Sequence, residues 1–399
     1  MDQQPPRRLT RKELLRRNKK IAKRRQQRLT FIVVALTAFL VYITGLYGTS
    51  LAYLGDFVSS GIVYLQFGDG FPIETENQTY KQSEKMGSSL CVLDSDSLKF
   101  YSPTGSLVYN YYHSMQNPVI NTSSKRVVIY NANDTSLKIS NASNILFSQE
   151  MQNDIIHASL SDNNWVAVTT KGQSYNGEVK VFDSQMKERL TWLSAKSFPL
   201  QGFLSPKAQT LLVSSIKTQD GKAVSDVYII DVATGEEKMV DTNHNGVMLA
   251  ARFVKEESVI VFYTDKAVNI SLSDYTVTKE YSYDGKDLIS FDVKNSQVVM
   301  ALGGYKGNTE TYIAVCDLAL NKNFGITLQD NITDVVIANQ RIYVLGEESV
   351  HQYTTETEYI SSTNVKNNIK NIIEYNGCVA VYGDSIEKID KAKIEKSKN

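Results

Sequence analysis

The sequence predicts an all-β fold, a β-propeller of about eight four-stranded blades that follows one transmembrane α-helix. Three observations support this prediction. The chain has one long uncharged apolar run near its N-terminus, many short β-branched and aromatic runs after it, and a repeat of about 40 residues among those short runs. Its 399 residues, of which 42% are hydrophobic, are enough for one large domain or two medium ones.

Residues 1–28 are expected to form a basic cytoplasmic tail. They carry twelve of the 43 Lys and Arg residues and only two acids, so the other 371 residues carry 31 basic and 41 acidic residues. Such a division indicates two parts that lie in different surroundings. A tail that binds nucleic acid is the alternative, but its position beside an apolar run favours anionic lipid headgroups.

Residues 29–55 are predicted to be the transmembrane helix and signal anchor. They contain no charged residue and are long enough to cross the roughly 30 Å hydrocarbon core of a bilayer. Because the basic residues precede this run, the positive-inside rule places the N-terminus in the cytoplasm and the C-terminal part outside. A cleaved signal peptide ending near Ala52 is the alternative, although the apolar region of a signal peptide is usually roughly 7 to 15 residues.

We therefore expect a single-pass protein of the cell membrane. Residues 56–70 would be a juxtamembrane linker, and residues 71–395 would form the extracytoplasmic propeller. A translocated domain of this size without a disulfide framework favours a bacterial envelope.

One apolar run of three residues recurs eight times and defines the repeat. The copies begin at residues 91, 127, 166, 211, 259, 298, 342 and 379, so successive copies are 36 to 48 residues apart. A polar turn precedes each copy, and two further strand-like runs follow it, as in VYIIDVATGEEKMV at 227–240. There, Val227, Ile229 and Val232 or their alternates are expected to pack between sheets, and residues 231–235 (D-x-x-T-G) to form the turn. Four antiparallel strands in about 40 residues are typical of a propeller blade.

Two segments resemble motifs of known propellers. FLSPKAQTLLVSS at 203–215 is similar to the F-S-P-D-G-x-x-L-A-V turn of WD40 and YVTN-type propellers, with Lys207 and Ala208 in place of Asp-Gly. The D-x-x-T-G turn is shared with these and with quinoprotein-like propellers. Together with the basic tail and anchor, the whole also resembles a family of uncharacterised membrane-anchored propellers of Gram-positive bacteria. This resemblance implies an architecture and no activity.

The last repeat, residues 367–394, is short and shows about three clear strands. A segment from the start of the propeller is expected to complete it, because closure by the other terminus removes exposed strand edges. Residues 62–67 (IVYLQF) and a strand near Ile73 are the two candidates, and a helical extension over residues 56–67 is an alternative for the first of these. A propeller of seven blades is the alternative if the first repeat is irregular.

No residue is predicted to be catalytic, cofactor-binding or metal-ligating, and no cofactor is expected. The four histidines fall in different repeats without metal-ligand spacing, and the three cysteines lie far apart inside apolar runs, where they favour core packing (His113, His157, His244, His351; Cys91, Cys316, Cys378). Asp94-Ser95-Asp96-Ser97 lacks the pattern of a calcium loop and favours a turn. The segment 302–308 (LGGYKGN) lies between strands and favours a hairpin loop over a phosphate site. Only two tryptophans are present, too few for the one per blade that the quinoprotein resemblance implies.

The predicted function is that of a non-catalytic binding scaffold or sensor. Its partner would be an envelope protein or a cell-wall component on the propeller face, in addition to membrane lipid around residues 29–55 and the basic tail. Nucleic acid is not expected as a partner, because the propeller is acidic. A hydrolase or lyase with a site at the channel mouth is the first alternative, and an envelope-assembly factor is the second.

Overall fold

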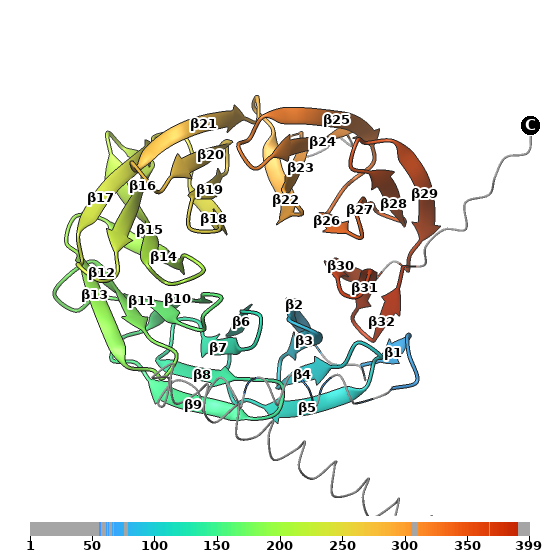
Figure 1. Cartoon of the computed structure of the whole chain (residues 1–399), viewed down its shortest axis with the longest axis horizontal. Helices are drawn as coiled ribbons and strands as arrows, with labels where there is room; N and C mark the ends of the chain where they lie inside the picture. Colours follow the sequence, from blue (N-terminus) through green and yellow to red (C-terminus); the bar gives the residue numbers. More distant parts are fainter. Residues whose placement is uncertain are drawn as a thin grey trace, which may run out of the picture. The chain divides into compact units, whose positions relative to one another are not determined.

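The structure is a computed structural model that describes residues 56, 61, 63, 66, 68–75, 79–304, 310–366 and 368–389. Its described strands belong to one compact unit, Val58–Asn399, and form eight four-stranded antiparallel sheets around a centre (Figure 1). This architecture confirms the predicted propeller and fixes the number of blades at eight. The predicted tail, residues 1–28, and the predicted helix, residues 29–55, lie outside the described residues.

The strands follow one another in simple up-and-down order within each blade. The first four blades consist of β2 (Tyr80–Met86), β3 (Ser89–Asp94), β4 (Ser97–Tyr101) and β5 (Leu107–Tyr112); β6 (Pro118–Thr122), β7 (Val127–Asn131), β8 (Ser136–Ser140) and β9 (Ile145–Glu150); β10 (Ile155–Leu160), β11 (Val166–Lys171), β12 (Gly177–Phe182) and β13 (Glu188–Ser194); and β14 (Phe198–Leu204), β15 (Thr210–Gln219), β16 (Lys222–Asp231) and β17 (Glu237–Asn243).

The second half of the ring repeats the plan until the last blade. Blades five to eight consist of β18 (Met248–Val254), β19 (Ser258–Tyr263), β20 (Lys266–Ser271) and β21 (Thr276–Ser282); β22 (Asp287–Lys294), β23 (Gln297–Gly303), β24 (Glu310–Asp317) and β25 (Lys322–Gln329); β26 (Asp334–Ala338), β27 (Arg341–Leu345), β28 (Ser349–Thr354) and β29 (Tyr359–Asn364); and β30 (Ile369–Glu374), β31 (Cys378–Tyr382), β32 (Ser385–Lys388) and β1 (Ile73–Glu74).

The eight apolar runs of the repeat are the second strands of the eight blades. Several are buried at every position, as in β3, β7 and β31. Their alternate residues face opposite blades: Leu212 packs toward the fifth blade, whereas Leu211 and Val213 pack toward the third. Each blade therefore buries both faces against its two neighbours, which is why one blade cannot be stable by itself.

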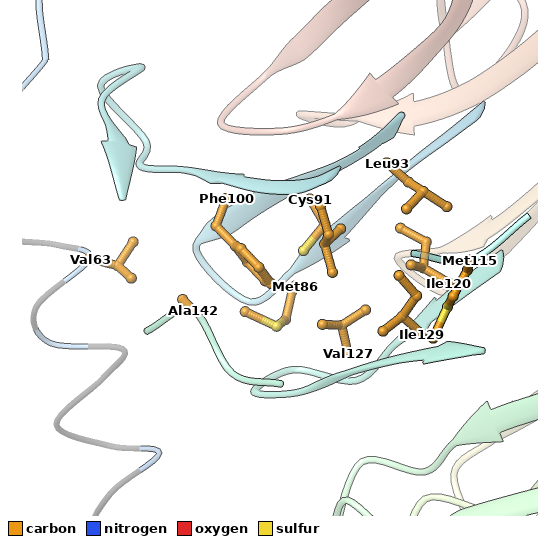
Figure 2. Packing of buried hydrophobic residues seen from close by; sticks show 11 residues of the cluster. Val63, Met86, Cys91, Leu93, Phe100, Met115, Ile120, Val127, Ile129 and Ala142 are labelled. Atoms are coloured by element: carbon orange, nitrogen blue, oxygen red, sulfur yellow. The ribbon is translucent and has the colours of Figure 1, made fainter. Parts of the chain in front are cut away.

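Figure 2 shows this packing between the first two blades. Phe100 and Cys91 of the first blade meet Val127 and Ile129 of the second, and all four side chains are fully buried. Val63, which precedes the propeller strands, packs on the same cluster. The three cysteines are all buried and free, as the apolar runs around them predict.

The ring closes through the segment near Ile73, which was one of the two expected closures. Strand β1 pairs antiparallel with β32, and Ile73 lies opposite Ile386. The hydroxyl of Tyr375 in the eighth blade donates to the carbonyl oxygens of Tyr101 and Ser88 in the first blade, at 2.9 and 3.0 Å. The two ends of the propeller are thus joined by a strand pair and by buried hydrogen bonds.

The D-x-x-T-G segment forms the turn between β16 and β17, as predicted. Oδ1 of Asp231 accepts hydrogen bonds from the amide of Thr234 at 2.8 Å and from its hydroxyl at 3.0 Å. These bonds hold the pKa of Asp231 below its ordinary value. Gly235 follows with a φ of 74°, a backbone conformation that glycine adopts without a steric cost.

The first strand of each blade stands nearest the centre and has one sheet edge with no neighbouring strand (Figure 1). The backbone groups on such an edge need hydrogen-bond partners. At most blade junctions, a polar side chain of one innermost strand reaches the backbone of the next. We call these contacts the inner belt.

Hydrogen bonds of the inner belt join seven of the eight pairs of neighbouring blades. Its hydrogen bonds, in ring order, are Gln82 Nε2 to Ile120 O (2.9 Å), Leu160 N to Asn121 Oδ1 (2.8 Å), Ser159 Oγ to Gly202 O (2.7 Å), Gln201 Nε2 to Leu249 O (3.2 Å), Ile337 N to Asp292 Oδ2 (2.8 Å), Ile372 N to Asp334 Oδ2 (3.2 Å) and Asn371 Nδ2 to Ser83 Oγ (3.2 Å). Between blades five and six, the guanidinium of Arg252 lies 5.3 Å from the ring centroid of Phe291 instead.

We predict that Ile386→Ala destabilises the protein by about 2 to 5 kcal/mol, because Ile386 is fully buried at the ring closure. Leu107→Ala is the matched control, since Leu107 is 49% exposed on an outermost strand, and its cost should stay below about 1 kcal/mol. Urea unfolding of the full chain, followed by circular dichroism, measures both. Equal losses in the two variants would contradict the closure described above.

We predict that Asp334→Ala costs about 2 to 4 kcal/mol, because it leaves the amide of Ile372 and the hydroxyl of Ser290 without their acceptor. Glu236→Ala is the control, since this exposed carboxylate takes no part in the inner belt. The same unfolding experiment compares them. If Asp334→Ala were as stable as the control, the inner belt would not hold the blades together.

Candidate functional site

A cavity of about 420 Å³ opens beside the innermost strands of the first five blades. Its walls come from β2, β6, β10, β14 and β18 and from the turns that follow two of them, near the ends at which these strands finish. The wall residues are Glu84, Asn121, Thr122, Ser159, Leu160, Ser161, Asp162, Phe203, Leu204, Pro206, Ala251, Arg252 and Phe253. A ligand here would contact five segments that are far apart in sequence.

The cavity is lined by polar groups because the innermost strands do not pack between sheets along their whole length. Their alternating pattern buries one set of residues between blades and turns the other toward the belt and the channel. Two wall segments are the turns after β10 and β14. In the first turn, the hydroxyl of Ser161 accepts from the amide of Trp165 at 3.0 Å, and Asp162 is left exposed at the tip.

Arg252 supplies the positive charge of the cavity wall. Its Nη1 donates to the carbonyl oxygen of Ala251 at 2.9 Å, and its guanidinium lies over Phe291. The side chain is accessible to solvent in the channel, yet the surrounding protein lowers its pKa by desolvation, against the opposing charges of Glu84 and Asp292. Within the described part of the chain, no carboxylate oxygen lies within 4.0 Å of this guanidinium.

Glu84 lies on the wall from the first blade, and both its carboxylate oxygens are engaged. Oε1 accepts from Gln82 Nε2 at 2.7 Å, and Oε2 accepts from the hydroxyl of Thr122 at 2.9 Å. Burial raises the pKa of Glu84, although the hydrogen bond from Thr122 and the charge of Arg252 act in the opposite direction. The carboxyl is therefore easier to protonate than an exposed glutamate.

Asp162 is the second acid of the wall and belongs to the third blade. Desolvation and the nearby charge of Glu256 raise the pKa of its carboxyl. The cavity thus has one cation and two acids, contributed by three different blades. A small ligand with both an anionic group and hydrogen-bond donors would complement this arrangement.

The innermost strands of the remaining blades carry a different arrangement at the same ends. Glu374 of the eighth blade receives ion pairs from Lys85 of the first at 2.5 Å and from Lys294 of the sixth at 2.6 Å. Burial by itself would raise the pKa of Glu374, but the two ammonium groups outweigh it and lower that pKa. Here the carboxylate is paired with two ammonium groups, whereas the described charges on the cavity wall form no ion pair with one another.

Two further acids of the inner belt have raised pKa values. Burial is the main cause for both Asp292 and Asp334, and it exceeds the effect of the backbone amides that each carboxylate accepts from. Their oxygens bind the amides of Ile337 and Ile372 on the next blade. The shifted pKa values therefore have a structural origin in the ring.

The histidines lie apart from one another, as their spacing predicts. The ring of His157 lies 5.0 Å from that of Phe203 at an angle of 58°, and burial lowers its pKa to about 4, which keeps it neutral. His113 is held by the backbone of Asp94, His351 by Asp330 at 3.0 Å, and His244 lies in the connection between β17 and β18.

The other segments singled out in the sequence are structural where they are described. Asp94 accepts from the amides of Asp96 and Ser97, so residues 94–97 form the predicted turn. The segment 302–308 joins β23 to β24, in agreement with the predicted hairpin loop, although residues 305–309 lie outside the described residues. Trp192 is buried and donates to Glu237, and Trp165 lies beside Arg189.

Sequence reasoning did not identify Arg252, Glu84 or Asp162 as site residues. Each is an isolated charge in or next to an innermost strand, and no motif connects them. The sequence did contain one relevant signal. A charged residue inside an alternating run that comes just before an apolar run indicates an innermost strand. The convergence of the three blades requires the closed ring and is invisible in a linear pattern.

The described residues contain no helix that is long and apolar enough to cross a membrane, and the predicted anchor at 29–55 is not among them. The fold is similar to several solved structures. One is BamB from Moraxella catarrhalis, with 13% sequence identity, a TM-score of 0.53, and coverage of 80% of this chain and 98% of BamB. Another is the computationally designed protein Ika8, with 15% identity, a TM-score of 0.56, and coverage of 79% and 98%.

A third similar structure is the dihydro-heme d1 dehydrogenase NirN, with 12% identity, a TM-score of 0.58, and coverage of 72% of this chain and 67% of NirN. At these identities the similarity establishes the propeller fold alone. No curated protein matches the sequence. One family model does match, over residues 70–390, which is the whole propeller. The chain therefore belongs to this family, DUF5711, which is described as a family of unknown function.

Proposed function

We propose that the protein is a membrane-anchored binding scaffold or sensor whose propeller lies outside the cell membrane. Residues 29–55 would be the anchor, residues 1–28 the cytoplasmic tail, and the partner an envelope protein or a cell-wall component. The charge division of the chain supports this topology. The observation that carries the binding role is the cavity, because four of the five blades that line it contribute polar side chains to one opening.

The size and walls of the cavity suit recognition. About 420 Å³ is within the usual range of ligand pockets and holds a fragment of a few residues. Arg252 and Asp162 offer opposite charges, and Phe203 and Phe253 offer apolar contact between them. Loops and strand ends held by a rigid ring lose little entropy on binding, which favours affinity.

A hydrolase or lyase is less well supported by the acids near the channel. Raised pKa values do occur at active sites, and Glu84, Asp292 and Asp334 all have them. A general base, however, needs a lone pair directed at its substrate. The oxygens of these three carboxylates accept hydrogen bonds from neighbouring strands, so a structural role accounts for them.

An envelope-assembly factor is a special case of the proposed scaffold. The similarity to BamB, at 13% identity, supports a common fold and supplies no partner for this chain. The identity of the captured partner would separate assembly from other binding roles.

We predict that a photo-crosslinking amino acid at Asp162 captures a discrete partner in intact cells. Asp162 is exposed at the cavity wall, so a bound molecule would lie within reach. The control is the same replacement at Glu356, an exposed residue of the turn between β28 and β29. Electrophoresis of the irradiated cells gives the readout. No product from Asp162, or the same products from both positions, would contradict binding at the cavity.

We also predict that a tag after Asn399 is degraded by protease added to intact cells whose wall has been removed. The reason is the positive charge of the tail, residues 1–28, which should stay in the cytoplasm, so that the propeller lies on the outer side of the membrane. A second tag before residue 1 is the internal control and should stay intact until the membrane is opened with detergent. Protection of the C-terminal tag would overturn the proposed topology.

A further inference from the structure

The guanidinium of Arg252 has unused binding capacity. It carries five N–H donors, and the described residues provide one acceptor for it, the carbonyl oxygen of Ala251. The flat face of the group is covered by Phe291, at 5.3 Å from the ring centroid. The remaining donors lie in the plane of the group and are accessible to solvent in the channel.

The acids near Arg252 do not neutralise it by contact. Glu84 and Asp292 affect its pKa through charge, but their oxygens accept from Gln82, Thr122 and the amide of Ile337 instead. Arg252 is exposed, so water hydrates its free donors and a carboxylate ligand can replace that water. Planar, two-point binding of a carboxylate is the geometry that arginine provides best.

The other residues of the cavity wall determine which kind of anion can bind beside Arg252. Glu84 and Asp162 are acids of the same cavity, so a dianion such as phosphate would be repelled more strongly than a single carboxylate. Asn121 uses its Oδ1 to accept from Leu160, and its side-chain NH2 remains free to donate to a ligand carbonyl. Asp162 accepts from a ligand N–H, and Phe203 and Phe253 contact small apolar side chains.

We propose that this cavity binds the free carboxyl terminus of a short peptide, with its carboxylate on Arg252 and its last amide between Asn121 and Asp162. The inference rests on the proposed binding function and names the chemistry of the ligand. It covers the terminus of a protein partner and a peptide of the cell wall alike, since both present the same carboxylate and amide groups.

Binding of N-acetyl-alanyl-alanine to the full chain in detergent micelles tests the inference by calorimetry. The wild type should bind this acid at least about tenfold more tightly than its C-terminal amide, because only the acid pairs with the guanidinium. Inorganic phosphate should not compete at equal concentration. Equal binding of acid and amide, no binding of the acid, or competition by phosphate would each overturn the proposal.

Two neutralising substitutions at the same cavity should act in opposite directions. Arg252→Gln should weaken binding of the acid by about tenfold or more, whereas Glu84→Gln should strengthen it several-fold by removing a repelling charge. Arg341→Gln, which lies on the second strand of the seventh blade, is the control and should change nothing. Loss of binding in both cavity variants, with unchanged unfolding curves, would contradict a carboxylate on Arg252.

Arg252 also contributes to the inner belt, so its replacement needs a second variant. Arg252→Lys keeps the charge and should retain weak binding, between the wild type and Arg252→Gln, because an ammonium lacks the two-point geometry. If Arg252→Gln unfolds, the affinity of Arg252→Lys for the acid is measured instead. An affinity equal to that of the wild type would then overturn the proposal. The in-cell crosslink from Asp162 separates the two ideas: a partner captured equally by the Arg252 variants would support the scaffold and contradict the carboxylate site.

Discussion

The inner belt is the constraint on which the rest of this structure depends. A propeller blade is a short sheet whose first strand has no neighbouring strand on the channel side. The amides and carbonyls on that inner edge therefore need other hydrogen-bond partners. Here, polar side chains of one blade bond the backbone of the next, as Asn121 does to the amide of Leu160 and Asp334 to that of Ile372. The same contacts fix how far each blade is rotated from its neighbour. Hydrophobic packing between sheets supplies the larger stabilisation, but it is not directional and would tolerate sliding.

The belt also explains the electrostatics of the channel. Asp292 and Asp334 are half-buried where they serve as acceptors for the next blade, and desolvation raises their pKa values. Glu374 is treated differently, since Lys85 and Lys294 pair with it and lower its pKa. Arg252 stands at the one junction where a cation over an aromatic ring replaces a belt hydrogen bond. That replacement leaves most of its donors free, and it places a positive group on the wall of the cavity.

The ring brings residues that are far apart in the sequence onto one cavity wall. The propeller is shared with proteins as different as BamB, a designed protein and NirN, so the fold by itself selects no chemistry. What is particular to this chain is the set of groups on the cavity wall. Arg252, Glu84 and Asp162 come from three blades, and the proposed carboxylate-bearing peptide rests on their combination. Three of the acids with raised pKa values, Glu84, Asp292 and Asp334, accept hydrogen bonds from neighbouring strands of the ring.

The sequence alone determined the repeat and the architecture. The apolar runs had to be the second strands, because residues buried on both faces read as continuous hydrophobic segments, and the turn at 231–235 is local chemistry that the chain carries anywhere. The innermost strands were less visible, since their polar residues serve the belt and the channel and weaken the apolar signal. The closing strand at Ile73 and the presence of Arg252, Glu84 and Asp162 on one cavity wall were decided only by the tertiary structure. Residues 168 positions apart line the same cavity in the closed ring, and no local preference specifies that arrangement.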